Sequence, residues 1–401
     1  MSTSWTRVKL GEILDEPLRN GVSPSTDGDV EARVLTLSAI TGTSFDASAN
    51  KVGRFKRSPP SHYRVNSSDL LICRGNGNLA LVGRGFFPSE DRVDLVFPDT
   101  VIAARVSRAK ANQSYVQYLW NSSLVRVQIE SRARTTNGTF KINQEILHEI
   151  VMPLPSLAEQ AVIAARLEGL DRLRALRVQA LYALDELLQS TFVAMFGDPV
   201  GDKISWARGV VGSFVWRYET GKNLVADDAD NPDSKYRVLK VSAVTSLVFD
   251  PKESKALPEG YEPPSSHFVR EGDLLFSRAN TEALIGATAL VGETSQSLAL
   301  PDKLWRFVWY EPQRAEVLYV RQLFQQASFR REIARRSSGT SGSMKNISQS
   351  KVLSIPVGLP PLELQREFAR RVVAVEELKA KQQAQLQQLD KLFAALQDKA
   401  F

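Results

Sequence analysis

The sequence predicts an α+β protein with two similar globular domains, each mixed and mostly β, and each followed by a long α-helix. We expect the two helices to pair as an antiparallel coiled coil. Three observations support this fold class: the chain repeats itself, each repeat changes once from strand-like to helix-like composition, and the two helical stretches share one heptad pattern. The length of 401 residues leaves room for two such units with hydrophobic cores of their own.

The internal repeat extends along the chain in a fixed order. RVLTLSAITGTSFD begins at Arg33 and returns as RVLKVSAVTSLVFD at Arg237, which is 237 − 33 = 204 residues later. DLLICRGN at Asp69 returns as DLLFSRAN at Asp273, with the same offset. Since the strings keep their order and spacing, the two halves are expected to fold alike.

Residues 1–155 and 198–360 are the predicted globular domains. They contain short β-branched or alternating runs such as RVLTLSAI, DLLIC and TVIAARV, separated by Gly, Asn, Pro and Asp. Runs of this kind between turn residues indicate strands of a mixed, mostly β domain.

Residues 156–197 and 361–401 are the predicted long helices. Both stretches are rich in Ala, Leu, Glu, Gln, Lys and Arg, and apart from Pro361, which suits a helix start, they lack proline. At 1.5 Å per residue each helix would be roughly 60 Å long.

Both helices carry a heptad seam with apolar ends and a polar centre. The later seam comprises Phe368, Val372, Val375, Lys379, Gln382, Leu386, Leu389, Phe393 and Leu396. The earlier seam lies 205 residues upstream, at Ile163, Leu167, Leu170, Arg174, Arg177, Leu181, Leu184, Leu188 and Thr191. We expect the antiparallel pair to place Arg174 and Arg177 across from Gln382 and Lys379, and such polar core positions can fix the register. The alternative is that each helix packs on its own globular domain.

Composition narrows the class of protein without naming a partner. A net charge of +6 and a pI near 9.3 are compatible with a polyanionic partner but are weak support by themselves. Cys73 is the single cysteine, which excludes an internal disulfide framework and a Cys-rich zinc site. The sequence contains neither a signal peptide nor an apolar run of membrane-spanning length, so we expect a cytoplasmic protein without a membrane partner.

Catalytic signatures are missing from the sequence. His62, His148 and His267 are the only histidines, and none has a second histidine or a cysteine at metal-ligand spacing. GNGNLALVGRG and TGKN resemble phosphate loops only superficially, and there is no Gly-x-Ser-x-Gly elbow and no Asn-Pro-Pro-Tyr motif. We therefore expect no catalytic residue, cofactor or metal in this chain, which indicates a recognition protein.

Two polar segments at equivalent places are the strongest candidates for nucleic-acid contact. ESRARTTNGTFK and ARRSSGTSGSMK combine arginines, small polar residues and a lysine, which suit phosphate oxygens and guanine edges. The candidate residues are Arg132, Arg134 and Lys141 in the first half, and Arg335, Arg336 and Lys345 in the second. The alternative is that both segments are solvated loops.

A second pair of candidate segments follows the DLL strands. CRGNGN and SRANTE supply Arg74, Asn76, Arg278 and Asn280. The asparagines could pair with adenine edges or simply cap turns. A weaker third pair of segments, LRNGVSPS and YETGKNLV, supplies Arg19, Asn20 and Lys222.

The order of these parts resembles the specificity subunit of type I restriction-modification systems. The resemblance covers the whole chain, and its most specific strings are DLLFSRANT and the helix entries LPSLAEQ and LPPLELQ, followed in the first half by MFGDP. The second entry has Glu363 and Leu364 before its final glutamine, and so departs from the Glu-Gln pair that the first has at Glu159 and Gln160.

This resemblance implies that residues 1–155 and 198–360 are target recognition domains, each reading one half of a bipartite sequence in double-stranded DNA. It implies that the helices set the spacer and dock two methyltransferase subunits, and that restriction subunits join the full complex. The chain would not be an enzyme: S-adenosylmethionine, ATP and Mg would belong to the partners, which methylate an adenine flipped out of the stack.

Other hypotheses remain open at this point. One is the specificity subunit of a related system whose partner fuses methyltransferase and nuclease. Another is a duplicated coiled-coil adaptor that binds proteins, and a third is an enzyme that acts on nucleic acid. DNA recognition predicts binding that weakens steeply with salt, whereas an adaptor does not.

Overall fold

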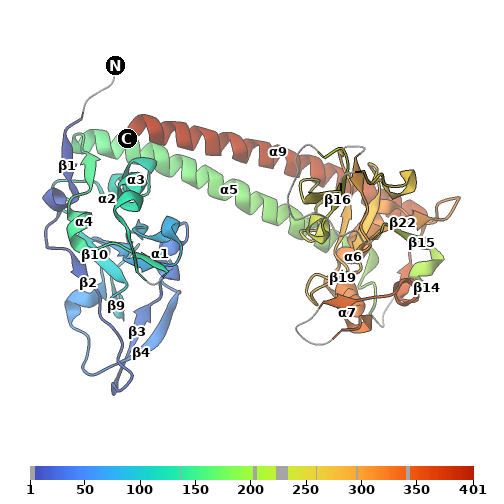
Figure 1. Ribbon diagram of the computed structural model, residues 1–401, viewed down its shortest axis with the longest axis horizontal. Coiled ribbons are helices and arrows are strands. Elements are labelled where there is room, and N and C mark those ends of the chain that lie inside the picture. Colours follow the sequence, from blue (N-terminus) through green and yellow to red (C-terminus); the bar gives the residue numbers. More distant parts are fainter. Residues whose placement is uncertain are drawn as a thin grey trace. The chain divides into compact units, whose positions relative to one another are not determined.

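The structure is a computed structural model that describes residues 5–136, 138–201, 206–222, 234–258, 260–294, 297–339 and 344–401. The chain divides into two units. The first unit contains Met1–Val178 together with Ala384–Phe401, and the second contains Gln179–Gln383. Figure 1 labels the elements of both units.

The two long helices predicted from the sequence are present as α5 (Leu157–Phe196) and α9 (Leu362–Ala400). A capping box begins α5: the Glu159 amide donates to Ser156 Oγ (3.3 Å), and the Glu159 carboxylate accepts from the Ser156 amide (3.0 Å). Gly197 ends it with φ of +77°, a conformation that suits glycine at a helix C-terminus.

Equivalent glutamines attach the helix entries to the globular domains. Gln160 donates to the Pro155 carbonyl (2.8 Å) and accepts from the Asn112 amide (2.7 Å). Gln365 donates to the Pro360 carbonyl (2.8 Å) and accepts from the Glu316 amide (3.0 Å). The repeated LPSLAEQ and LPPLELQ strings thus have one physical role, because each final glutamine joins a helix start to the domain before it.

In the first unit the two helix segments run antiparallel. Ile163 of α5 and Phe401, just beyond α9, pack on the same hydrophobic core. Farther along α5, Arg174 Nε lies 2.7 Å from Asp390 Oδ1, and its guanidinium lies 4.9 Å from the Phe393 ring centre. Moving forward on α5 therefore means moving backward on α9.

The second unit shows the same antiparallel arrangement. Phe192 of α5 meets Phe368 of α9 with ring centres 5.5 Å apart, and Lys379 Nζ lies 2.8 Å from Asp185 Oδ1. The sequence predicted that Arg174 and Arg177 lie across from Gln382 and Lys379. In the structure, Arg174 pairs with Asp390, and Lys379 pairs with Asp185. The two cations, Arg174 and Lys379, occupy equivalent helix positions, since 379 − 174 = 205. The two carboxylates, Asp185 and Asp390, do so as well, since 390 − 185 = 205.

Within its described residues, the first globular domain contains four sheets. Its termini meet in the two-stranded sheet of β1 (Arg7–Lys9) and β13 (Val151–Pro153). The central sheet has the order β2 (Arg19–Asn20), β10 (Val101–Arg105), β6 (Asp69–Cys73), β8 (Gly85–Phe86). A second sheet has the order β4 (Asn50–Phe55), β3 (Val30–Leu35), β9 (Arg92–Val96), β5 (Arg64–Val65), and a third has the order β11 (Arg134–Thr136), β12 (Thr139–Lys141), β7 (Gly75–Asn76).

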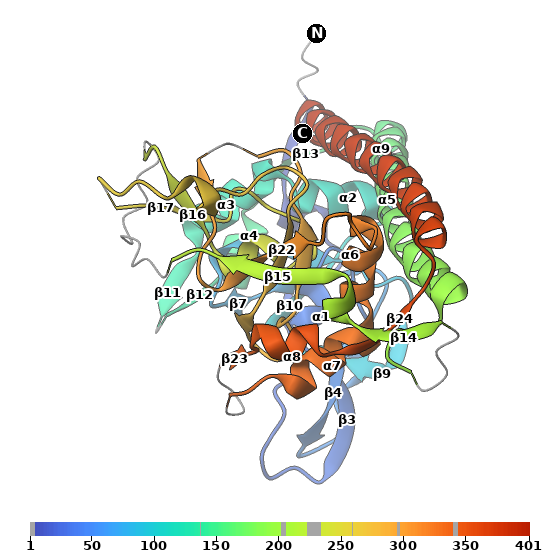
Figure 2. The same ribbon diagram turned by 90° about the vertical axis from the view of Figure 1, so that its right-hand side faces the viewer.

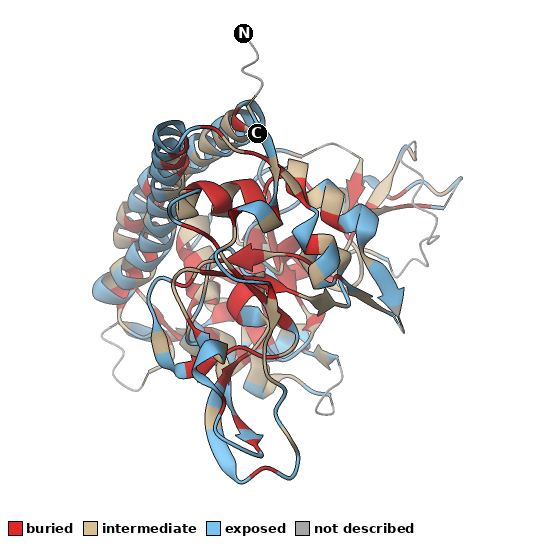
Figure 3. Cartoon of the chain, turned by 90° about the vertical axis from the view of Figure 1, so that its left-hand side faces the viewer, coloured by how far each residue is buried: buried red, intermediate tan, exposed pale blue. Residues whose placement is uncertain are grey.

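Short helices cover the central sheet of this domain. They are α1 (Ser38–Thr41), α2 (Gln113–Trp120), α3 (Ser123–Arg132) and α4 (Gln144–His148). Every residue of β6 is buried, as expected for a strand with neighbours on both sides, and Figure 3 shows the buried interior of the domain in red. Tyr115 and Trp120 of α2 are fully buried, and each donates to a backbone carbonyl, so burial leaves neither polar group unpaired.

The second globular domain repeats this plan, with shorter strands in the sheet equivalent to β4–β3–β9–β5. Its sheets are β14 (Ala207–Val210) with β24 (Pro356–Leu359); β15 (Val215–Thr220), β22 (Leu304–Trp309), β18 (Leu274–Ser277), β20 (Thr288–Leu290); β17 (Ser254–Ala256), β16 (Arg237–Leu239), β21 (Leu298–Ala299); and β19 (Ala279–Asn280) with β23 (Lys345–Asn346). Its helices are α6 (Val317–Gln325), α7 (Ala327–Arg336) and α8 (Gln349–Leu353), and Figure 2 shows them beside β15.

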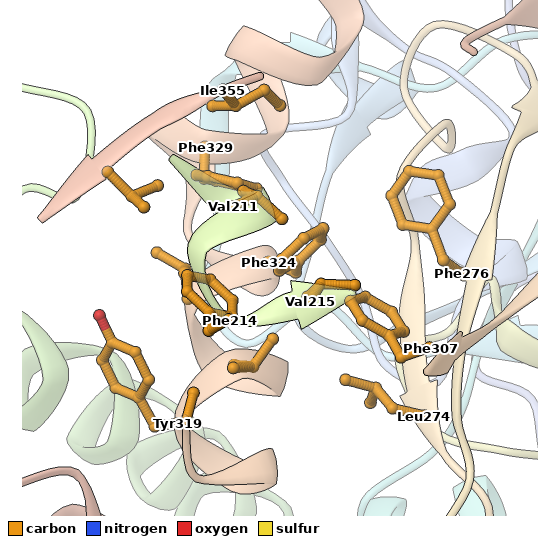
Figure 4. Close-up of a cluster of buried hydrophobic side chains, with 14 of the residues drawn as sticks. Val211, Phe214, Val215, Leu274, Phe276, Phe307, Tyr319, Phe324, Phe329 and Ile355 are labelled. Atoms are coloured by element: carbon orange, nitrogen blue, oxygen red, sulfur yellow. The ribbon is translucent and has the colours of Figure 1, made fainter. Parts of the chain in front are cut away.

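Aromatic side chains fill the core of the second domain (Figure 4). The Phe324 ring lies 5.1 Å from Phe307 and 5.9 Å from Phe276, both in edge-to-face geometry. Tyr319 of α6 stacks on Phe192 of α5 at 5.6 Å. The same core therefore holds the sheet, α6 and the end of the long helix together.

An aspartate lies at or just before the start of the central strand of each domain. Asp69 is fully buried and accepts hydrogen bonds from Arg19 and from Arg105, whose Nη2 lies 3.0 Å away. Asp273, at the equivalent position, accepts from Arg306 Nη1 at 3.2 Å. The strings DLLIC and DLLFS thus start with a structural carboxylate in both units.

Within the described ranges, no helix is both long enough and apolar enough to cross a bilayer.

Candidate nucleic-acid interface

A small β-ribbon gathers four of the predicted site residues in the first unit. In the β11–β12–β7 sheet, Arg134 pairs with Lys141, and Lys141 in turn pairs with Gly75. The next backbone contact is a 2.9 Å hydrogen bond from the Ile142 amide to the Arg74 carbonyl. The segments containing Arg74, Asn76, Arg134 and Lys141 are therefore neighbours in space, although more than 50 residues separate some of them in sequence (134 − 76 = 58). We call this sheet the first ribbon.

The second unit contains an equivalent, shorter ribbon. Asn280 of β19 pairs with Lys345 of β23, and the Ile347 amide donates to the Arg278 carbonyl at 3.1 Å. The structure thus brings Arg278, Asn280 and Lys345 together. We call this pair of strands the second ribbon. Residues 340–343, which belong to the predicted polar segment before Lys345, lie outside the described residues.

Arg74 and Arg278 hold the turn that precedes the neighbouring strand. Arg74 Nη1 donates to the Asp99 carbonyl at 3.2 Å, and Arg278 Nε donates to the equivalent Asp302 carbonyl at 2.7 Å. Both side chains are half-buried. Each guanidinium is therefore partly engaged in shaping its ribbon.

Arg132 and Arg336 occupy the ends of α3 and α7. Arg132 donates to the Glu149 carbonyl, and Arg336 donates to the equivalent Ser354 carbonyl, both at 3.4 Å. These contacts tie the end of each helix to the segment after α4 or α8. Arg336 also donates to Ser354 Oγ at 3.1 Å, so this side chain has a clear structural role.

The predicted asparagines cap turns. Asn76 Oδ1 accepts from the Asn78 amide at 2.9 Å, and Asn280 Oδ1 accepts from the Thr281 amide at 2.8 Å. These bonds realise the turn-capping alternative, as is common for asparagine in loops.

The weaker candidates Arg19, Asn20 and Lys222 lie outside the two ribbons. Arg19 is committed to the Asp69 network and its side chain is only 15% exposed. Asn20 belongs to the edge strand β2, next to Gln144. Lys222 is exposed and forms a backbone bridge with Pro301.

Two pairs of repeated residues that stabilise the ribbons were missed from the sequence. Gln349 of α8 donates to the Tyr218 carbonyl (3.1 Å) and accepts from the Tyr218 amide (3.4 Å), which fixes the start of α8 after β23. Gln144 of α4 contacts the equivalent strand β2. The 205-residue offset (349 − 144 = 205) between these glutamines was the available signal.

Arg126 and Arg330 form the other missed pair. Arg126 donates to the carbonyls of Val82 (2.5 Å) and Leu79 (3.3 Å), and Arg330 donates to that of Ala283 (2.7 Å). Ala283 is the equivalent of Leu79, since 283 − 79 = 204. Each arginine therefore pins the loop that follows β7 or β19 to α3 or α7.

Charge pairing differs between the two ribbons. Arg134 and Lys141 of the first ribbon are exposed, and neither forms an ion pair with another described residue. In the second unit, Lys345 Nζ lies 3.7 Å from Glu282, and Arg278 lies 3.6 Å from the Asp302 carboxylate. Arg134 and Lys141 of the first ribbon are thus free for phosphate, whereas Lys345 and Arg278 of the second ribbon are already balanced.

Glu332 balances Arg335 and Arg336, two further predicted cations of the second unit. It accepts from Arg335 at 2.8 Å and from Arg336 at 2.6 Å. These hydrogen bonds, chiefly that from Arg335, lower the pKa of Glu332 to about 2. The first unit has Gln128 at this position, since 332 − 128 = 204, and Gln128 instead bonds the backbone of Val151.

Among the residues that the structure describes, no cluster of three or more His, Cys, Asp or Glu side chains could hold a metal ion. The arrangement instead presents basic and amide side chains on short strands, which suits hydrogen bonding to phosphates and base edges.

Comparison with known proteins agrees with this description. Residues 4–182 match a family model described as the type I restriction modification DNA specificity domain. The EcoEI specificity subunit of Escherichia coli is 27% identical over 202 residues, and the alignment covers 49% of this chain and 34% of that protein. The EcoKI specificity subunit of Escherichia coli K12 is 28% identical over 199 residues, covering 48% and 42%. The chain thus spans less than half the length of these two relatives.

Longer alignments extend the similarity to both units. The MjaVIII specificity subunit of Methanocaldococcus jannaschii is 22% identical over 403 residues, covering 96% of this chain and 90% of that protein. The crystal structure of a type I restriction-modification S subunit from M. genitalium has the same fold, with a TM-score of 0.54 at 13% identity over 99% of this chain and 96% of that one. A chain from a study of type I complex assembly gives a TM-score of 0.56 at 18% identity, covering 99% and 97%. Residues 4–182 thus match the DNA specificity domain of type I restriction-modification systems, and nearly the whole chain is similar to a type I specificity subunit.

Proposed function

We propose that this chain is the DNA-recognition subunit of a type I restriction-modification complex and that each ribbon faces one half of a bipartite target in double-stranded DNA. The observation that carries the proposal is the recurrence of a basic ribbon at the same place in both units. In the first ribbon, Arg134 and Lys141 lie side by side without a carboxylate partner among the described residues. Exposed basic side chains of this kind attract the phosphate backbone of nucleic acid.

The framework around each ribbon supports a division between positioning and reading. Gln349 and Arg330 fix the backbone around the second ribbon, and Gln144 and Arg126 contact the equivalent places in the first. The exposed side chains between these anchors differ between the units. Phosphate contacts position a protein on DNA, and base contacts specify the sequence. Two domains that recognise different half-sites can therefore share one backbone framework and differ in the exposed side chains that it carries.

The long helices would set the spacer and dock two methyltransferase subunits. Large apolar side chains remain exposed on α5 in each unit: Leu173 is 45% and Leu176 is 54% exposed in the first, and Leu187 is 48% exposed in the second. Apolar surface on a helix that already has a partner supports a further protein contact. Restriction subunits would join the same assembly.

The chemistry would belong to the partners, and the chain itself would be non-catalytic. S-adenosylmethionine would bind the methyltransferase subunits, and ATP with Mg would serve the restriction subunits. The absence of a catalytic motif from the sequence supports this assignment. In the cell, the expected compartment is the cytoplasm, where the DNA lies.

The test is to express this chain with its methyltransferase partner in a host without adenine methylation and to map methylated adenines across the genome. We expect one interrupted motif with two unlike halves and a fixed gap. A soluble complex that leaves the genome unmethylated would contradict the proposal. Methylation by the purified chain alone would show an enzyme instead.

A further inference from the structure

The loop after β19 has a rigid backbone. Arg330 of α7 donates to the Ala283 carbonyl at 2.7 Å, and the amides of Ile285 and Gly286 donate to Thr281 and Ser277, both at 2.9 Å. Gly286 has φ of +80°, and a Cβ there would lie 2.9 Å from Ile333, so glycine is required. The backbone hydrogen bonds fix both ends of the turn, and the bond from Arg330 fixes it to α7.

Glu282 projects from this rigid turn beside the second ribbon. Its side chain is 71% exposed, and its Oε2 lies 3.7 Å from Lys345 Nζ. Lys345 in turn pairs with Asn280 across the ribbon. The carboxylate therefore stands at the edge of the proposed DNA-facing surface, on a backbone that does not need to move.

The equivalent residue of the first unit is tied down. Asn78 occupies that position, since 282 − 78 = 204, and its Oδ1 accepts from the Ala80 amide at 3.0 Å. Asn78 thus shapes its own loop, whereas no hydrogen bond to the Glu282 side chain accompanies its ion pair among the described residues. At this equivalent position, Asn78 of the first unit caps a turn, whereas Glu282 of the second unit presents a carboxylate that can still accept a hydrogen bond.

An exposed carboxylate on a surface that meets DNA is repelled by the phosphates. A hydrogen bond accepted from a base offsets this repulsion. In the major groove, cytosine presents its N4 amino group as a donor without a neighbouring acceptor, whereas adenine places the N7 acceptor next to its N6 donor. A carboxylate therefore selects cytosine.

We propose that Glu282 is a specificity-determining residue of the second unit and that its carboxylate accepts a hydrogen bond from the N4 amino group of a cytosine in the half-site. Lys345 holds the carboxylate beside the ribbon and offsets its repulsion by the DNA backbone. This inference rests on the proposed function.

The test compares the full chain with its Glu282→Gln and Glu282→Asn variants, each expressed with the methyltransferase partner and mapped for methylated adenine. Glu282→Asn installs the residue of the first unit. We expect one cytosine position in one half of the motif to become degenerate, while the other half keeps its sequence. On duplexes that differ only at that position, discrimination measured as a ratio of Kd values should fall about 5- to 150-fold.

Glu311→Gln is the matched control, because Glu311 is also an exposed acid of the second unit but lies outside the second ribbon. It should leave the motif unchanged. If both Glu282 variants keep the motif and bind all duplexes more tightly, with a salt dependence steeper by about one unit, Glu282 only neutralises Lys345 and the inference is wrong. A motif without cytosine in either half would also overturn it. If the unchanged chain gives no methylation at all, the proposed function fails, and this inference fails with it.

Discussion

The two ribbons share a framework and differ in the state of their cations. Arg134 and Lys141 of the first ribbon lack a carboxylate partner within the described part of the chain, whereas Lys345, Arg335 and Arg336 of the second unit each have one. Both acids responsible occupy positions that hold amides in the first unit, because Glu282 is equivalent to Asn78 and Glu332 is equivalent to Gln128. A chain duplication can therefore preserve a fold while changing how strongly each copy attracts a polyanion.

The largest difference that we expect between the units concerns folding stability. Asp69→Asn should destabilise the first unit by about 3–5 kcal/mol, since it removes a fully buried carboxylate charge and leaves Arg19 and Arg105 with only the exposed Glu16 as an acidic partner. Asp273→Asn should cost less, because the Asp273 side chain is 19% exposed and Arg306 keeps Glu219 at 2.5 Å. Denaturant unfolding of both variants measures the difference. Equal losses would show that the two networks do the same work.

A smaller effect should appear in DNA binding. Lys141→Ala should lower the salt dependence of binding, expressed as the slope of log K against log[salt], by about 0.9, because it removes one free cation. Lys345→Ala should change the slope less, since Glu282 already balances that lysine. Titrations of one duplex at several salt concentrations compare the variants. A larger change for Lys345→Ala would reverse our reading of the two ribbons.

The smallest effect concerns acid stability. The pKa of Glu332 is lowered to about 2 by Arg335 and Arg336, so its stabilising contribution is present above the ordinary pKa of 4.5 and is lost as pH falls toward 2. Since the pair with Arg335 is solvent-screened, we expect about 1 kcal/mol or less. Glu332→Gln, which copies the first unit, should flatten the unfolding free energy between pH 4.5 and pH 2. An unchanged pH profile would show that the ion pairs do not contribute.

The long helices could be predicted because their signals are local. Ser156 and Glu159 form a cap within three residues, Gly197 ends α5, and the heptad seam is visible in one stretch of sequence. The partner of Arg174 was not predicted, since Arg174 meets Asp390 and the seam did not include that aspartate. Register depends on which charges meet across two helices, and a single-helix pattern does not contain that information.

The candidate site was predictable in its segments and less so in its geometry. The stretch from Arg134 to Lys141 was predicted as a polar segment for nucleic-acid contact. It forms the two strands β11 and β12, and β7, more than 50 residues earlier (134 − 76 = 58), supplies the third. The structural contacts of Arg132 and Arg336 involve carbonyls 17 and 18 residues farther on. Such partners depend on tertiary folding, which local composition does not reveal.

The arginine that pins each ribbon loop also bears on how new specificities arise. Since Arg126 and Arg330 hold the loop backbone from the helix side, an exchange at an exposed tip position such as 282 leaves the anchors in place. Exposed substitutions of this kind usually change stability by about 0.5 kcal/mol or less. A lineage could therefore acquire specificity for a new half-site by a single point mutation, without a second mutation that restores stability. Inherited variation would then accumulate at positions that change DNA recognition and leave folding unchanged.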